Sequence, residues 1–137
     1  MNNQTTLMSA CLAGFLGVAL GAFGAHGLKG MIEPSLMAAY QTGVQYHLVH
    51  AVALLAVGVW QQQQGGVNRW LNRAAMLLLA GLILFSGSLY LMAITGIRPL
   101  GIITPIGGTC WLIGWAMLAW SIRTQPDSTP TNTSNTQ

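Results

Sequence analysis

Charged residues are scarce in this chain of 137 residues. Asp, Glu, Lys and Arg make up 5% of the sequence, whereas a soluble domain normally carries about 25%. The two acidic and five basic residues all lie outside the long apolar stretches or at their ends. This composition argues against a water-soluble domain, because helices built from such stretches leave almost no polar face for water.

The shortage of acidic residues also excludes chemistry that needs paired carboxylates. Glu33 lies at the junction of a loop and a helix, and Asp127 lies in the C-terminal tail. No phosphate-binding loop, G-x-S-x-G motif or H-E-x-x-H motif occurs. We therefore expect no enzymatic activity. The net charge of +3 comes without a basic stripe that would neutralise phosphates, so we expect no nucleic-acid partner.

Four long apolar stretches dominate what is present, at residues 6–25, 38–60, 74–94 and 102–122. Each has the roughly 20 apolar residues that a helix needs to cross a hydrocarbon core of about 30 Å. Backbone groups in lipid must be satisfied within the segment, so each stretch should be helical. Membrane strands would instead alternate over segments of about ten residues.

The sequence therefore predicts an all-α fold, a four-helix transmembrane bundle over residues 1–123 that is embedded in a lipid bilayer. The connections at 27–33, 61–66 and 95–101 are short. Pro34 and Pro105 suit the opening turns of helices, and Asn68 is a candidate N-cap. The polar tail at 124–137 has nothing to bury, and we expect it to be disordered.

Basic residues near the span ends predict the orientation of the protein in the membrane. Four spans put both termini on one side, together with Arg69, Arg73 and Arg123, while Lys29 and Arg98 fall on the other. The positive-inside rule then predicts that both termini are cytoplasmic. Three tryptophans near the span ends suit anchoring at that same interface: Trp60, Trp70 and Trp120.

Small residues line one side of the first stretch. Ala10, Gly14, Gly17, Gly21 and Gly24 fall within about 80° of arc on a helix. Such a seam lets two helix backbones approach closely in lipid. We favour packing inside the molecule as the role of this seam, and a homo-oligomer or a membrane-protein partner is the alternative. The last stretch has a shorter version of this pattern: Gly107, Cys110 and Gly114.

Two histidines lie near the middle of the second stretch. Tyr40, Gly43, His47 and His50 share one helix face. Ionisable residues at that depth are expensive and should face the bundle interior. Including His26 at the end of the first stretch and nearby hydroxyl groups, the candidate polar site comprises six residues: His26, Tyr46, His47, His50, Ser86 and Tyr90. Further hydroxyl partners are available at Ser88, Thr104 and Thr109.

Three interpretations of the histidines remain open. They are structural if each neutral ring bonds to hydroxyl or carbonyl groups of other helices. They are metal or haem ligands if His26 folds inward to join His47 and His50, although no intramembrane carboxylate completes such a site. They handle protons or a quinone-like ligand if titratable groups form a chain. We favour the structural interpretation and expect no cofactor.

Four ordered blocks of the sequence are specific enough to carry a family resemblance. The blocks begin with Gly21-Ala22-Phe23-Gly24-Ala25-His26-Gly27-Leu28-Lys29, continue with Thr42-Gly43-Val44-Gln45-Tyr46-His47 through His50-Ala51, then Leu84-Phe85-Ser86-Gly87-Ser88-Leu89-Tyr90, and end with Gly101-Ile102-Ile103-Thr104-Pro105-Ile106-Gly107-Gly108. Together they resemble a small bacterial inner-membrane family known as domain of unknown function 423. The family is itself similar to a eukaryotic group of small transmembrane proteins.

This resemblance extends from the first helix to about Ile122. It implies a multi-pass protein of the bacterial inner membrane, and supplies no activity, cofactor or catalytic residue. The function that we expect is a non-enzymatic structural or accessory role in the membrane. The alternative is an ion-, metal- or ligand-handling protein whose site is built on the histidines.

Overall fold

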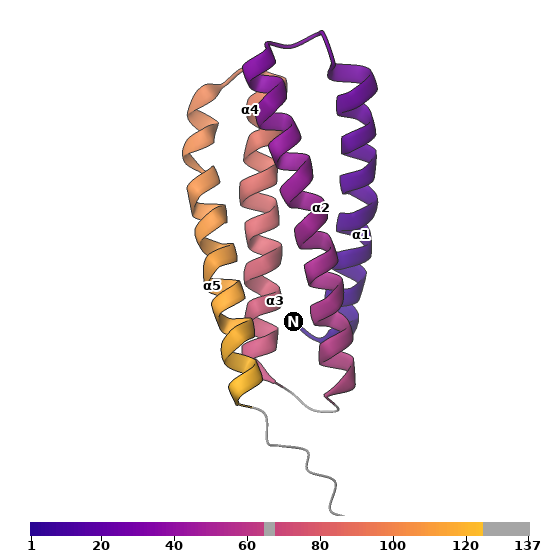
Figure 1. Ribbon diagram of the computed structural model, residues 1–137, viewed down its shortest axis with the longest axis vertical. Helices are drawn as coiled ribbons and strands as arrows, with labels where there is room; N and C mark the ends of the chain where they lie inside the picture. Colours follow the sequence, from indigo (N-terminus) through magenta and orange to yellow (C-terminus); the bar gives the residue numbers. More distant parts are fainter. Residues whose placement is uncertain (65–67, 125–137) are drawn as a thin grey trace, which may run out of the picture.

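The chain folds into four long apolar helical segments, each long enough to cross a membrane (Figure 1). This computed structural model describes residues 1–64 and 68–124. The segments are Asn3–Leu28, Pro34–Gln63, Arg69–Thr95 and Arg98–Arg123. The predicted all-α fold with four apolar spans is confirmed. The predicted disorder of the tail falls, from residue 125 onward, outside the described residues.

Helix irregularities divide three of the four segments. The elements are α1 (Asn3–Phe23), η1 (Gly24–Leu28, a π turn), α2 (Pro34–Gln63), α3 (Arg69–Gly81), η2 (Leu82–Ser86, a π turn), α4 (Gly87–Thr95), η3 (Arg98–Ile102, a 3₁₀ turn) and α5 (Thr104–Arg123). The π turn η2 has a clear consequence, because one extra residue rotates the following helix face by about 100°. In consequence α3 packs mainly on α5, whereas α4 packs on α2.

Local signals set the helix starts. The Asn2 side chain caps α1 by accepting a hydrogen bond from the Thr5 amide at 2.8 Å. The Asn68 side chain accepts from the amides of Trp70 and Leu71 at the start of α3, which confirms the predicted cap. Pro34 and Pro105 lie in the first turns of α2 and α5, as expected. A proline there loses no intrahelical hydrogen bond.

All three connections are shorter than predicted, and the third is reduced from 95–101 to residues 96–97, because α4 ends at Thr95 and η3 begins at Arg98. The prediction that 61–66 is a connection is wrong for 61–63, because α2 continues to Gln63. Glutamine favours helix, and the Gln61 amide is held by the Met1 carbonyl at 3.1 Å and Asn72 Oδ1 at 2.8 Å. The prediction that the first connection begins at residue 27 is also wrong, since the π turn η1 carries the helix to Leu28.

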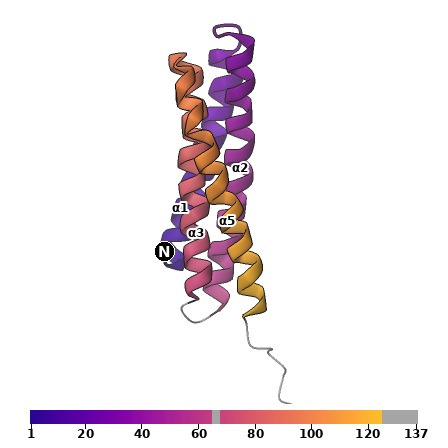
Figure 2. The same cartoon turned by 90° about the vertical axis from the view of Figure 1, so that its left-hand side faces the viewer.

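The helices follow the order α5, α3 with α4, α2 and α1 across the molecule (Figure 1). The pairs α1–α2 and α3–α5 pack along much of their length, and α2 joins the pairs by packing on α3, η2 and α4. The turned view shows the same helices running roughly along one axis (Figure 2). The N-terminus and the end of α5 lie at the same end of the molecule. The helix α2 is therefore central, and α1 and α5 are outer helices.

Apolar side chains fill the interior and also cover the outside. The larger core cluster is centred on fully buried Leu54, Leu71 and Leu78, and a smaller one surrounds Tyr40 and Tyr90. Large apolar residues stand exposed on every long helix, among them Phe15 of α1 and Leu112 of α5. An apolar exterior of this kind suits lipid as the surrounding solvent.

The small residues of the first stretch pack mostly against α2. A Cβ atom added to Gly17 would lie 2.7 Å from Leu48 Cδ2, and one added to Gly21 would lie 3.2 Å from Val44 Cγ1. At Gly24 it would collide with the Tyr40 ring. Gly14, in contrast, has no atom within 4 Å of the Cβ position. The seam therefore serves packing inside the molecule at three of its four glycines.

The shorter pattern on the last helix serves the same purpose. A Cβ atom at Gly107 would collide with the backbone nitrogen of Phe85 in η2. At Gly114 it would lie 3.4 Å from Leu77 Cβ and from Leu78 Cδ2. Glycine at these positions lets α5 approach the backbone of the third segment closely.

Candidate functional site

His47 joins three helices through its two ring nitrogens. Nε2 lies 2.8 Å from the Ala13 carbonyl of α1, and Nδ1 lies 3.1 Å from the Tyr90 hydroxyl of α4. A carbonyl oxygen only accepts, so Nε2 carries the hydrogen. In the neutral ring Nδ1 then accepts from the Tyr90 hydroxyl. The His47 side chain is buried and both nitrogens are paired.

His50 lies one turn further on and takes the opposite tautomer. Nδ1 lies 2.9 Å from the Tyr46 carbonyl and donates to it, which leaves Nε2 as the acceptor. The Trp115 indole N–H of α5 donates to this Nε2 across 3.4 Å. The Trp111 ring stacks on the His50 ring, with centroids 3.6 Å apart and 6° between the planes. His50 thus connects α2 to α5, whereas His47 connects it to α1 and α4.

A second polar side chain repeats the attachment of α2 to α1. The Tyr40 hydroxyl donates to the Leu20 carbonyl at 2.6 Å, as His47 donates to the Ala13 carbonyl. The two donors are seven residues apart on α2, and the two acceptors are seven residues apart on antiparallel α1. Seven residues are close to two helical turns, so both bonds lie on one seam. They fix the register of α1 on α2.

The remaining predicted site residues occupy the contact between α2 and the third segment. Ser86 is fully buried in η2, and its hydroxyl donates to the Gly43 carbonyl at 2.8 Å. Tyr90 packs on the Tyr40 ring, with centroids 5.0 Å apart. Tyr46 is 44% exposed, and its ring stacks on Trp111 with centroids 5.7 Å apart. Tyr46 therefore contributes mainly its backbone carbonyl and an aromatic face.

The other predicted hydroxyl partners lie away from the imidazole rings. Ser88 and Thr104 bond to each other at 2.8 Å, which links α4 to the start of α5. Thr109 is exposed and bonds to the Pro105 carbonyl of its own helix. These hydroxyl groups support helix contacts, and none of them bonds to a histidine within the described part of the chain.

His26 stands apart from the other two histidines. It lies in η1 at the far end of α1, is exposed, and bonds through Nδ1 to the Ala22 carbonyl of its own helix at 3.0 Å. The structure thus brings His47, Tyr90 and Ser86 together near Gly43, and His50 with Tyr46 near α5. Across residues 1–64 and 68–124, no three His, Cys, Asp or Glu side chains are grouped so that they could hold a metal ion.

Sequence reasoning missed the aromatic residues around His50. Trp111 stacks on its ring and donates its indole N–H to the Leu78 carbonyl at 3.0 Å. Phe85 packs on Trp111 with centroids 4.6 Å apart. The signal was present in the sequence, because Trp111 and Trp115 stand four residues apart and so share a helix face. Their direction toward His50 depends on the rotation of α5, which the sequence does not reveal.

An exposed ion pair links two connections at the end of the molecule opposite the N-terminus. Glu33 Oε2 and an Arg98 guanidinium nitrogen lie 2.7 Å apart, joining the first connection to the third. Ser35 donates to the Glu33 carboxylate at 2.7 Å. The Ser35 hydrogen bond, and then the hydrogen bond and charge of Arg98, hold the pKa of Glu33 below its usual range.

Comparison with known proteins finds relatives that are named as membrane proteins. The family model described as protein of unknown function (DUF423) matches residues 20–108. The chain belongs to this family. It is 46% identical to UPF0382 membrane protein YwdK of Bacillus subtilis over 75% of this chain and 83% of the relative. It is 40% identical to UPF0382 inner membrane protein YgdD of Escherichia coli K12 over 90% and 93% of the two chains.

A third relative extends the range of organisms. The chain is 42% identical to UPF0382 membrane protein SAB0533 of Staphylococcus aureus, over 82% of this chain and 89% of the relative. No solved structure matches the chain. The family resemblance in the four sequence blocks is confirmed, and so is the assignment to the bacterial membrane as a multi-pass protein.

Proposed function

We propose that this protein is a non-enzymatic structural or accessory component of the membrane, and that its intramembrane histidines hold helices together. The observation that carries the proposal is that each ring has its own separate partners. His47 bonds to Ala13 and Tyr90, while His50 bonds to Tyr46 and Trp115. A ligand-handling site would instead leave convergent nitrogens directed at a shared space.

The cost of an unpaired polar group in hydrocarbon supports this role of the histidines in helix packing. A polar side chain in hydrocarbon that lacks a partner costs several kcal/mol, so satisfied histidines specify which helices pack together. Hydrogen bonds between membrane helices contribute about 0.6 kcal/mol each on average. The bonds of Tyr40 and His47 to α1 lie on the same seam, and they favour one register over its alternatives.

An accessory protein acts through its outer surface. Of the glycine seam, Gly14 is the position that α2 leaves open, and a second copy or another membrane protein can approach α1 closely there. The basic residues support an orientation with both termini in the cytoplasm. Arg69, Arg73 and Arg123 lie toward the end of the molecule that holds the N-terminus, and Arg98 at the other end is paired with Glu33.

Purification of the full chain in a mild detergent tests this proposal. An ultraviolet–visible spectrum, metal analysis and an intact mass would show a haem, a metal or a quinone if one is bound. We expect none in stoichiometric amount, and we expect His47→Gln to lower the melting temperature. A bound species that is lost on substitution of His47 or His50 would refute the structural role and establish the ligand-handling alternative.

A further inference from the structure

An apolar groove opens on the membrane face between α3 and α5. Its volume is about 420 Å³, within the usual range of ligand pockets, about 300–1,000 Å³. The lining comes from one residue of α3 and five of α5: Trp70, Leu112, Ile113, Ala116, Met117 and Trp120. None of the candidate site residues takes part in it. The groove is therefore distinct from the helix contacts made by the histidines.

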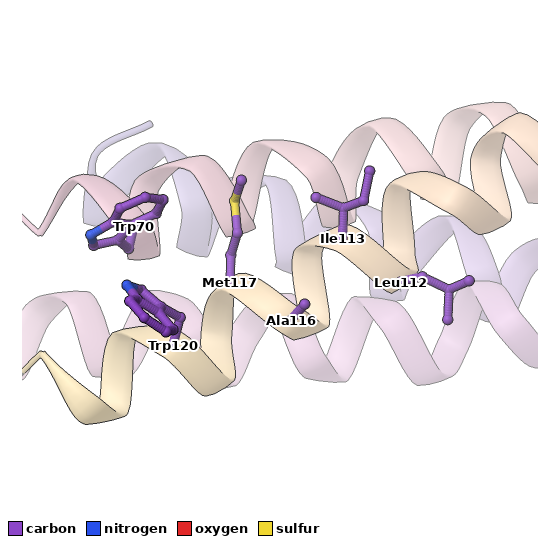
Figure 3. A pocket seen from close by; sticks show the side chains of 6 residues that line it. All are labelled: Trp70, Leu112, Ile113, Ala116, Met117 and Trp120. Carbon is purple, nitrogen blue, oxygen red and sulfur yellow. The ribbon is translucent and has the colours of Figure 1, made fainter.

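The groove runs along the helix axis. Its α5 lining extends from Leu112 to Trp120, and these two residues are eight positions apart, or about 12 Å at the rise of an α-helix. Figure 3 shows Trp70 and Trp120 together at one end, with Leu112 toward the other. An acyl chain in a bilayer runs in the same direction as a transmembrane helix. The shape and the apolar lining thus suit a single hydrocarbon chain.

The tryptophan end of the groove is basic. The Arg69 and Arg73 guanidinium carbons lie 5.6 Å and 5.7 Å from the centroid of the Trp70 ring. Both side chains are exposed, and Arg123 ends α5 at the same end of the molecule. Glu33, the one acidic residue in the described part of the chain, lies at the opposite end and pairs with Arg98. The positive charge beside the groove is therefore not balanced by a described carboxylate.

We propose that this groove binds one acyl chain of an anionic phospholipid and that Arg69 and Arg73 bind its phosphate. A planar guanidinium group matches the geometry of phosphate oxygens. Trp70 and Trp120 have amphipathic rings of the kind that locate at the headgroup level, so the charges stand where a headgroup would lie. A zwitterionic lipid carries a choline cation that the arginines repel, and this makes the site selective for net negative lipids.

Native mass spectrometry of the full chain tests the proposal directly. The protein is incubated with equal amounts of phosphatidylglycerol and phosphatidylcholine that have identical acyl chains. We expect one phosphatidylglycerol to be retained in preference. Replacement of both arginines, Arg69→Gln/Arg73→Gln, should weaken retention by about fivefold for each arginine removed. Equal retention of the two lipids would overturn the proposal.

A charge-matched control separates the site from general attraction. Lys29→Gln/Arg98→Gln removes two positive charges from the opposite end and should leave retention unchanged. An equal loss of retained phosphatidylglycerol in both double variants would mean that net charge alone holds the lipid, and would overturn the proposed site. Inorganic phosphate at millimolar concentration should not displace the lipid, because it lacks an acyl chain. Displacement by phosphate would contradict the role of the groove.

A second pair of variants tests the groove itself. Ala116→Phe fills it without altering charge, and Ala56→Phe places the same ring on the exposed surface of α2. Each alanine precedes a terminal tryptophan by four residues, so the two positions have similar depth. We expect loss of the lipid in Ala116→Phe alone. The parent protein could instead be a dimer that shows no selective lipid retention, with Ala116→Phe monomeric. That result would assign the groove to a second copy and overturn the proposal.

Melting temperatures are measured for all variants so that lost lipid is not confused with unfolding. Arg69 and Arg73 are exposed, and their substitution leaves the packed core intact. If Ala116→Phe fails to fold, the double arginine variant and its charge-matched control still decide the question.

Discussion

The Tyr90 hydroxyl donates to Nδ1 of His47 across 3.1 Å, between α4 and α2. The second ring nitrogen of His47 is used by the Ala13 carbonyl of α1 at 2.8 Å. One imidazole ring thus makes contacts with two other helices and has no nitrogen left over. Both polar atoms of a histidine inside an apolar protein are thus satisfied by groups of the protein itself.

The first prediction concerns this hydrogen bond. Tyr90→Phe removes the donor and leaves Nδ1 of His47 unpaired, so the free energy of unfolding should fall by about 0.6–2 kcal/mol. Tyr46→Phe is the matched control, because the Tyr46 hydroxyl is not bonded to any described residue and its side chain is 44% exposed. Denaturation in detergent measures both. Equal decreases in the free energy of unfolding for the two substitutions would contradict the hydrogen bond between Tyr90 and His47.

A double-mutant cycle extends this test. His47→Leu removes the partner of Tyr90, so Tyr90→Phe should cost less in that background than in the parent protein. A coupling energy near zero would show that the two side chains do not interact.

The second prediction concerns the contact between α1 and α2. Gly17→Leu places a bulky side chain where a Cβ atom alone would lie 2.7 Å from Leu48 Cδ2. It should separate the helices and lower the melting temperature strongly. Ala22→Leu introduces the same side chain at an exposed position of α1 and should be mild. Similar melting temperatures for both variants would show that the seam does not pack as described.

The third prediction compares two identical substitutions. Gly107→Ala brings a methyl group against the backbone of Phe85 and should cost about 1–3 kcal/mol or prevent folding. Gly14→Ala meets no atom within 4 Å and should stabilise α1 by about 0.5–1 kcal/mol. Chemical denaturation of the purified variants gives both values. An unchanged free energy of unfolding in Gly107→Ala would contradict the close approach of α5 to η2.

The fourth prediction concerns acid pH at the Glu33–Arg98 pair. The folded-state pKa of Glu33 is lowered, so its contribution to stability is present above its unfolded-state pKa of about 4.3. This contribution is lost as the pH falls through the folded-state pKa. Hydrogen exchange of the first and third connections should therefore rise between pH 5 and pH 3.

Glu33→Gln should remove this pH dependence, whereas Lys29→Gln, a charge change in the same connection, should preserve it. The exchange rates are compared after correction for the intrinsic effect of pH. A Glu33→Gln protein that retained the full acid response would show that another group is responsible.

The fifth prediction concerns orientation. A reporter fused to the C-terminus should be active in the cytoplasm, because Arg69, Arg73 and Arg123 outnumber Lys29 and Arg98. Activity in the periplasm would reverse the orientation. Reporters at the two termini that fall on opposite sides would contradict the count of four spans.

The sequence predicted the helices and three of their starts, at Pro34, Asn68 and Pro105, but not where the first and second helical segments stop. Apolar length is a strong signal because the bilayer requires it. The connection at 61–63 was misjudged because glutamine is polar, whereas Gln61 is held in the helix by contacts to Met1 and Asn72. The π turn at Leu82–Ser86, after which α4 packs on α2 whereas α3 packs on α5, was also not foreseen, since the apolar stretch at 74–94 continues across it.

The polar interior was predicted in part. The depth of His47 and His50 followed from their place in the second stretch, and both rings are buried as expected. The hydrogen-bond partners of the two rings could not be predicted, because one of them is the backbone carbonyl of Ala13, which no sequence pattern marks. His26 was included in the candidate site by proximity to a span end, but it lies exposed in η1, apart from the other two.

The most direct test of the structural role is a comparison of the purified parent protein with His47→Gln. Intact mass, metal content and absorption spectrum are measured beside the melting temperature. We expect a lower melting temperature in His47→Gln, because Gln replaces only part of the hydrogen bonding. We also expect that no bound metal, haem or quinone is lost with the ring. A near-stoichiometric bound species in the parent protein that is absent from His47→Gln would contradict the structural role.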